Sequence, residues 1–236
     1  MADAPPKHNH ALLALLLLVP APTIGVIAAM LLPATSGTPL GQGVYMASKL
    51  WLVALPAAWW LWIDRGRLSL SPPRKGGFGV GITLGVIIAG AIFGVYHLVG
   101  REMIDPQMVR ESAERSGIAE PWRYLALAVY LCSLNAVIEE YVWRWFVFHK
   151  CEVLVKTGWI AVLLSAFLFT VHHVLALAAQ FDWRVTALAS LGVFIGGAVW
   201  SWCYLRYRSI WPGFVSHLIV DVAIFIIGWQ LIFSGE

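Results

Sequence analysis

Carboxylates, imidazoles and one guanidinium interrupt three otherwise apolar stretches in the C-terminal half of the sequence. Burying such groups costs several kcal/mol each unless they are paired or hydrated, so a chain that keeps them there has a use for them. Together, carboxylates and imidazoles could activate a water molecule for hydrolysis or relay protons. The residues are Glu139, Glu140 and Arg144 in the first stretch, His172 and His173 in the second, and His217 and Asp221 in the third.

These stretches belong to a chain whose composition is that of a membrane protein. Of its 236 residues, 60% are hydrophobic and only 12% are charged, and the mean hydropathy is +0.76. Soluble domains carry about a quarter of charged residues. The formal net charge of +3 is small and scattered, so no nucleic-acid partner is indicated. The composition predicts an all-α integral membrane protein that contacts the lipid bilayer.

A helix of about 20 apolar residues crosses a bilayer, and the sequence offers seven such segments. They predict a single polytopic membrane domain over residues 1–236, with a motif-bearing four-helix core at about residues 124–233. The first segment is expected to be a retained helix and not a signal peptide, because it is long and contains two prolines. A short surface helix is expected over 105–117. The seven predicted spans are Ala11–Leu32, Gly43–Trp62, Phe78–Val99, Tyr124–Phe148, Gly158–Ala179, Val185–Leu205 and Trp211–Phe233.

Basic residues in the connections between spans predict the orientation of the chain. With a cytoplasmic N-terminus, nine Lys or Arg residues lie in the inside connections and five in the outside ones. The sequence therefore predicts a cytoplasmic N-terminus and a C-terminus outside.

Helical geometry predicts which of the ionisable groups form pairs. Glu140 and Arg144 lie one turn apart on one face of the fourth span, whereas Glu139 points to an adjoining face. We therefore expect a Glu140–Arg144 pair and a less neutralised Glu139. In the seventh span, His217 and Asp221 also lie one turn apart on one face.

The predicted depths of these groups do not agree at first sight. At about 1.5 Å per residue, Glu139 and His217 lie roughly 13–17 Å from the cytoplasmic ends of their helices, whereas His173 lies about 25 Å from Lys156. Tilt, a late start of the fifth helix or a break in it would close that gap.

Each group also has a purely structural interpretation. A single membrane histidine often bonds a carbonyl, a Glu–Arg pair can hold helices together, and His217 with Asp221 could be an interhelical clasp. Their joint occurrence on three helices favours a functional site. Tryptophans within the spans are expected to pack. The same holds for Cys132, Cys151 and Cys203, which lack the spacing of a metal cage.

The segments EEYVWR, FTVHH and HLIVD follow one another on successive apolar helices and fit the patterns EExxxR, FxxxH and HxxxN/D. Over about residues 135–225, the chain thereby resembles the CPBP (or ABI) family of intramembrane proteases, which includes the type II CAAX-prenyl endopeptidases. The resemblance implies a glutamate-dependent, metal-free endopeptidase that cuts membrane-anchored protein substrates. The breadth of that family and the small chain suggest a bacterial inner membrane.

The motif matches imply a role for each residue. Glu139 matches the general base, and His173 matches the histidine that helps it to hold and activate a water. His217 matches a residue that polarises the scissile carbonyl or stabilises its oxyanion. An ionised Asp221 would repel an oxyanion, so Asp221 is protonated, orients His217 through its other nitrogen, or has no catalytic task; the orienting role is preferred. The supporting residues are Glu140, Arg144, His172 and Phe169.

Three other interpretations stay open. Two histidines and a glutamate could bind zinc, but the sequence has no HExxH and the ligands would come from three helices, so no cofactor or metal is expected. A catalytically silent scaffold or assembly subunit of the same fold could bind partner transmembrane helices. A proton-coupled transporter could use the same chain of acid and imidazole groups.

Overall fold

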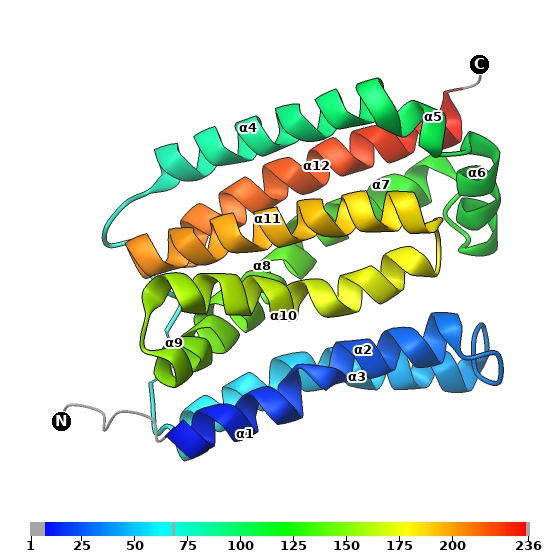
Figure 1. The fold of residues 1–236 in the computed structure, drawn as a ribbon. Coiled ribbons are helices and arrows are strands. Elements are labelled where there is room, and N and C mark those ends of the chain that lie inside the picture. Colours follow the sequence, from blue (N-terminus) through cyan, green and yellow to red (C-terminus); the bar gives the residue numbers. More distant parts are fainter. Residues whose placement is uncertain (1–7, 68, 235–236) are drawn as a thin grey trace.

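The computed structural model describes residues 8–67 and 69–234, and these residues form a bundle of helices (Figure 1). Seven helical segments are long and apolar enough to cross a membrane. The chain is thus an all-α integral membrane protein, as its composition predicts. The seven segments are His8–Leu31, Pro39–Ile63, Phe78–Met103, Pro121–Val155, Gly158–Ala178, Trp183–Tyr207 and Trp211–Phe233.

Several of these spans are built from more than one helical element. α-Helices alternate with short π-helical segments, and two such segments, η4 and η5, flank the short helix α8. The α-helices are α1 (His8–Leu18), α2 (Pro20–Val26), α3 (Pro39–Ala58), α4 (Phe78–Val95), α5 (Arg101–Met103), α6 (Pro106–Arg115), α7 (Pro121–Tyr130), α8 (Ala136–Glu140), α9 (His149–Val155), α10 (Gly158–Ala178), α11 (Trp183–Tyr207) and α12 (Trp211–Phe233). The π-helical segments are η1 (Ile27–Leu31), η2 (Trp59–Ile63), η3 (Tyr96–Gly100), η4 (Leu131–Asn135) and η5 (Tyr141–Phe148).

The fourth span is longer than predicted, while the other six differ from their predicted limits by a few residues at most. The prediction ended this span at Phe148, before the charges of the next segment. The helix instead continues to Val155, because Lys150 is fully buried and forms an ion pair with Asp64. A charge that has a partner of opposite sign does not have to leave the protein interior.

The helices pack in layers (Figure 1). The first two spans form a helical hairpin, α1–η2, which contacts α9, α10 and η5. On the opposite side of the molecule, α4 packs along α12. The fourth to seventh spans lie between these two outer layers, and they carry the ionisable residues singled out in the sequence.

A stripe of small residues brings α4 close to α12. Gly81, Gly85 and Ala89 are spaced four residues apart and are buried on one face of α4. A Cβ atom at Gly85 would lie 3.0 Å from the Cα of Ser216. Such small-residue faces let membrane helices approach closely. Because Ser216 precedes His217, this approach sets the position of the histidine relative to α4.

Hydrogen bonds hold the turn before α12 and the second half of this helix. The hydroxyl of Ser209 donates to the carbonyl of Ser71 over 2.7 Å, and the backbone N–H of Ile210 donates to the Ser71 hydroxyl over 3.0 Å. Further along, the Tyr124 hydroxyl donates to the Phe225 carbonyl over 2.8 Å. The helix that carries His217 is thus fixed to two other parts of the chain.

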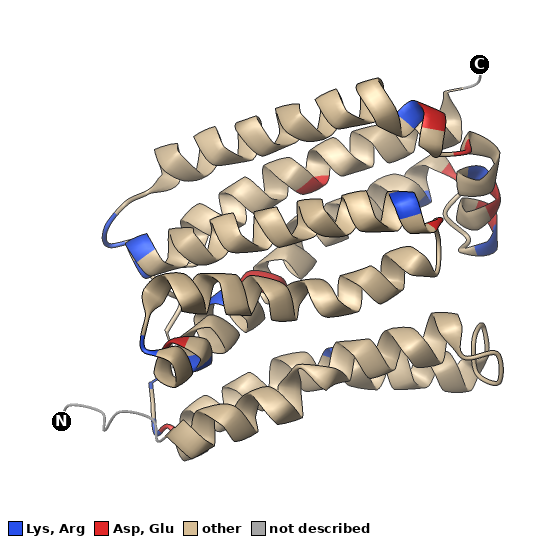
Figure 2. Cartoon of the chain, viewed as in Figure 1, with Lys and Arg blue, Asp and Glu red and all other residues tan. Residues whose placement is uncertain are grey.

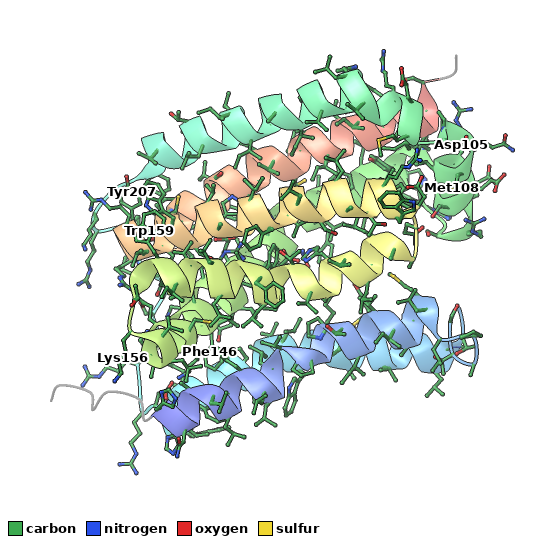
Figure 3. The ribbon with its side chains drawn as sticks, in the orientation of Figure 1. Asp105, Met108, Phe146, Lys156, Trp159 and Tyr207 are labelled. Carbon is green, nitrogen blue, oxygen red and sulfur yellow. The ribbon has the colours of Figure 1, made fainter. Side chains whose placement is uncertain are left out.

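The two ends of the bundle carry different features. Lys156 and Tyr207 lie at one end, and Asp105 lies at the other, where α6 forms the predicted surface helix (Figure 3). At the first end, Arg208 makes two ion-pair hydrogen bonds to Glu152, of 2.6 and 2.8 Å. The hydrogen bonds to this carboxylate raise the pKa of Arg208 above its usual range.

Candidate active site

One carboxylate oxygen joins the fourth and seventh spans. Oε1 of Glu140 lies 3.1 Å from Nδ1 of His217 and 3.5 Å from Nε of Arg144. The exposed fractions of the Glu140, Arg144 and His217 residues are 0%, 1% and 4%. The expected Glu140–Arg144 pair is therefore present, and His217 is a third member that the spacing within the fourth span could not indicate.

Aromatic rings enclose these buried charges. The Trp200 ring stacks on His217 with 3.8 Å between centroids and 16° between planes. The guanidinium of Arg144 lies 4.5 Å from the ring centre of Phe169 and 5.1 Å from that of Trp200. Such contacts stabilise cations away from water. Trp200, which was expected only to pack, brings the sixth span into the site.

A glycine makes room for the buried carboxylate. Gly213 lies one turn before His217 on α12, and a Cβ atom there would lie 2.6 Å from Oε2 of Glu140. Any larger residue at this position would displace the carboxylate that holds His217. The close approach of α8 to α12 therefore depends on Gly213.

Two partly exposed carboxylates lie beside the other ring nitrogen of the buried His217. Its Nε2 lies 3.6 Å from Oδ1 of Asp221 and 3.8 Å from Oε2 of Glu139. The exposed fractions of the Glu139 and Asp221 side chains are 15% and 19%. The side-chain amide of Asn135 donates to Oε1 of Glu139 over 2.9 Å, which leaves Oε2 directed toward His217.

The position of Asp221 corrects one expectation. The preferred role was to orient His217 through the nitrogen that does not face the reaction. That nitrogen, Nδ1, is occupied by Glu140, and Asp221 lies beside Nε2 together with Glu139. Spacing along α12 predicts that His217 and Asp221 meet, but only the neighbouring helix decides which ring nitrogen each carboxylate approaches.

The two adjacent histidines of α10 have different surroundings. Nδ1 of His173 lies 2.9 Å from the carbonyl of Phe169, and the His173 side chain is half-buried. His172 is buried and stacks on Trp143 with 5.3 Å between ring centroids. Among the described residues, His173 and Glu139 form no direct ion pair.

The greater length of the fourth span removes the apparent difference in depth between Glu139 and His173. α10 begins at Gly158 as predicted and is continuous, so neither a late start nor a break is present. Because α9 extends to Val155, Glu139 lies about 24 Å of helix from the α9–α10 turn, and His173 lies about 22 Å from it. The two residues are therefore at similar heights on neighbouring helices.

The segment that carries this site is similar to a known protein family. Residues 121–223 match the family model described as type II CAAX prenyl endopeptidase Rce1-like. This match agrees with the resemblance to the CAAX protease (CPBP) family that the three sequence motifs carry. The Rce1-like segment begins at the first residue of α7, ends within α12 and includes every site residue predicted from the sequence. No curated protein and no solved structure matches the chain.

Some residues of the Rce1-like segment that contact the site were not predicted. Asn135 lies one helical turn before Glu139, so the spacing of the sequence could have shown it. Trp200 and Gly213 left no such signal, because their contacts depend on how α11 and α12 are rotated against α8. The stripe on α4 was readable as a GxxxGxxxA pattern.

Metal-binding groups and reactive cysteines are the other kinds of site considered in the described residues. Within the ranges that the structure describes, no three His, Cys, Asp or Glu side chains are grouped so that they could hold a metal ion. Cys132, Cys151 and Cys203 are buried and unpaired thiols among the described residues. Their burial agrees with the packing role expected from the sequence.

Proposed function

We propose that the protein is an intramembrane endopeptidase that hydrolyses a peptide bond of membrane-anchored protein substrates. The proposal rests on the arrangement around His217, whose Nδ1 is held by buried Glu140 while its Nε2 faces partly accessible Glu139. Hydrolysis by an activated water needs a base and a hydrogen-bond donor that face the same accessible space. The family match over this segment supports the same activity.

Glu139 is the base in this proposal. Its carboxylate, held by Asn135, takes a proton from water, and the water oxygen forms a bond to the scissile carbonyl carbon. The carbonyl of Phe169 accepts the hydrogen of Nδ1 of His173, so Nε2 of His173 keeps a lone pair. That lone pair accepts the second hydrogen of the same water and orients its oxygen.

His217 stabilises the negative charge that develops on the carbonyl oxygen. Because Nδ1 donates to Glu140, donation from Nε2 requires a hydrogen on both ring nitrogens. The surrounding carboxylates supply the counter-charge for that form, and Asp221 contributes to it from its place beside Nε2. The C–N bond then breaks, the proton on Glu139 passes to the leaving nitrogen, and the second water hydrogen is released through Nε2 of His173, which leaves an amine and a new carboxylate.

The proposed reaction uses no metal ion. The buried side of the site already holds a cation, since the Arg144 guanidinium lies 3.5 Å from Glu140. A metal ion bound to Glu140 would be repelled by the positive charge of Arg144. Treatment of the purified protein with a chelator should leave cleavage unchanged, and loss of cleavage that added zinc restores would contradict this part of the proposal.

For the orientation, we propose a cytoplasmic N-terminus and an outside C-terminus in a bacterial inner membrane. At the end of the bundle where Figure 3 labels Lys156 and Tyr207, Figure 2 shows Lys and Arg residues, which supports this placement. A C-terminal reporter that is active only outside the cytoplasm would agree with it. A reporter active only in the cytoplasm would contradict it.

The activity can be tested in cells by comparing C-terminal fragments of the membrane proteome. Cells with the unchanged protein should contain fragments that cells with Glu139→Gln lack. Glu114→Gln is a matched control, because Glu114 is exposed on α6. Identical fragment sets in all three strains would contradict a protease and would favour a scaffold that binds partner helices.

A further inference from the structure

The indole of Trp200 on α11 contacts both basic side chains of the site. Its ring stacks on that of His217 with 3.8 Å between centroids, and the Arg144 guanidinium lies 5.1 Å from its centre. The Trp200 residue is only 4% exposed. The proposed reaction places a positive charge on His217 but assigns no task to the ring that covers it.

The indole and the carboxylates contact different parts of the imidazole of His217. Glu140 lies at Nδ1, whereas Glu139 and Asp221 lie beside Nε2. The indole is nearly parallel to the imidazole, with 16° between planes, and therefore covers one face of it. Carboxylates at the two nitrogens restrict where those atoms lie. A ring stacked on the face restricts the plane of the imidazole, and with it the direction in which Nε2 donates.

A hydrogen bond fixes the indole against the helix that carries His217. Nε1 of Trp200 donates to Oγ of Ser216 over 3.1 Å. Ser216 directly precedes His217 on α12, and both residues are buried. The orientation of the indole is therefore set relative to the histidine itself and not only by the packing of α11.

A glycine leaves space for the indole on its own helix. Gly196 lies one turn before Trp200, and a Cβ atom there would lie 3.2 Å from Cη2 of the indole. A larger side chain at this position would displace the ring without removing it. Gly196 thus offers a way to test the place of the indole separately from its presence.

The stack also favours the charged form of His217. The face of an aromatic ring attracts a cation, most strongly where water is excluded. The positive charge of Arg144 opposes a second cation nearby, and the carboxylates at the two nitrogens favour it. α4 contributes no charged residue, and those of α11, Arg184 and Arg206, lie close to its two ends. The indole therefore adds to the carboxylates in offsetting the charge of Arg144.

We propose that Trp200 is a positioning residue that keeps both ring nitrogens of His217 protonated and holds the ring in the plane from which Nε2 donates to the oxyanion. This inference rests on the proposed function and adds a residue of the sixth span to it. Trp200 acts through His217 and does not touch the substrate.

Three variants in nanodiscs separate stacking from packing. Trp200→Leu removes the aromatic face and the N–H donor, whereas Trp200→Phe keeps an aromatic face. Trp202→Leu is the matched control, because Trp202 is a partly buried residue of the same helix and no ring or cation contact joins it to the site in the described part of the chain. We expect kcat to fall by roughly tenfold or more in Trp200→Leu at unchanged KM, to stay within about threefold in Trp200→Phe, and to be unchanged in Trp202→Leu.

Nitrogen-15 NMR of histidine-labelled protein reads the state of His217 without any turnover. It distinguishes an imidazole with two N–H groups from one with a single N–H group, and His217→Gln identifies the signal. At neutral pH, His217 should carry both hydrogens in the unchanged protein, in Trp200→Phe and in Trp202→Leu. In Trp200→Leu, a fraction with one hydrogen should appear. If Trp200→Leu does not fold, Gly196→Leu takes its place, because it displaces the indole.

Two spectroscopic results would overturn the inference. One is a single hydrogen on His217 in the unchanged protein. The other is a Trp200→Leu protein whose His217 keeps both hydrogens, because a fall in kcat would then come from packing; an equal change in Trp202→Leu has the same meaning. If the unchanged protein cleaves no substrate, the proposed function fails, and the spectra alone decide whether Trp200 holds the charged form of His217.

Discussion

The buried and accessible sides of the site are built from two adjacent glutamates with opposite surroundings. Glu140 is fully buried and shares one oxygen with Arg144 and His217. Glu139 is partly accessible, accepts one hydrogen bond from Asn135 and faces the second nitrogen of His217. A helix turns by about 100° per residue, so neighbours in sequence point to different faces. One carboxylate therefore holds the geometry of the site, while the other stays available for chemistry.

Removing the guanidinium tests the buried side and should have the largest effect on stability. Arg144→Met leaves the Glu140 carboxylate buried without its cation, so the free energy of unfolding should fall by about 3–5 kcal/mol. Unfolding in nanodiscs measures this change. The double variant Glu140→Gln/Arg144→Met should regain most of the lost stability. If Arg144→Met alone is as stable as the unchanged protein, the Glu140–Arg144 pair does not hold the buried side.

Crowding the α4–α12 contact tests whether the seventh span positions His217. In Gly85→Leu, the Cβ atom alone would lie 3.0 Å from Ser216, so overpacking should cost up to about 3 kcal/mol of stability and lower cleavage. Gly90→Leu is the matched control, because a Cβ atom at Gly90 meets no described atom within 4 Å. Equal stability and equal cleavage in the two variants would show that the contact with α4 does not position His217.

Deleting one hydrogen bond tests the accessible side. Asn135→Ala removes the amide that holds Oε1 of Glu139, and hydrogen bonds to charged groups contribute about 1.5–3 kcal/mol. We expect kcat to fall by roughly tenfold or more while KM changes little, and the free energy of unfolding should fall by at most about 1.5–3 kcal/mol. Recovery of kcat in Asn135→Gln would support positioning. A fall in stability without a fall in kcat would assign Asn135 to packing.

The smallest effect is expected at Asp221. In Asp221→Asn, an amide oxygen still accepts a hydrogen bond beside Nε2 of His217, so cleavage should stay within about threefold of the unchanged protein. Asp221→Leu, which lacks an acceptor, should lose more. A loss in Asp221→Asn as large as that of a base variant would place Asp221 in the proton transfer itself.

Local patterns account for what the sequence predicted correctly. Seven apolar lengths predicted seven spans, and one-turn spacing predicted the pairs Glu140–Arg144 and His217–Asp221. The end of the fourth span was predicted too early, because the partner of Lys150 lies 86 residues away in the sequence. Spacing along one helix cannot reveal contacts that depend on the rotation of two helices.

Helix rotation also explains which site contacts were missed. The stacking of Trp200 on His217, the space provided by Gly213 and the choice of ring nitrogen all arise between elements distant in the sequence. Asn135 differs from these, since it lies one turn before Glu139 and needs no tertiary information. Its role was readable from the sequence.

The most direct test of the central claim measures cleavage and unfolding of Glu139→Gln and Glu140→Gln in the same nanodisc preparation. Glu139→Gln should reduce cleavage by about a thousandfold and leave the free energy of unfolding unchanged, because it removes a base from an accessible position. Glu140→Gln should reduce both quantities, because it removes the carboxylate that Arg144 and His217 share. Cleavage by Glu139→Gln at the level of the unchanged protein would show that Glu139 is not the base.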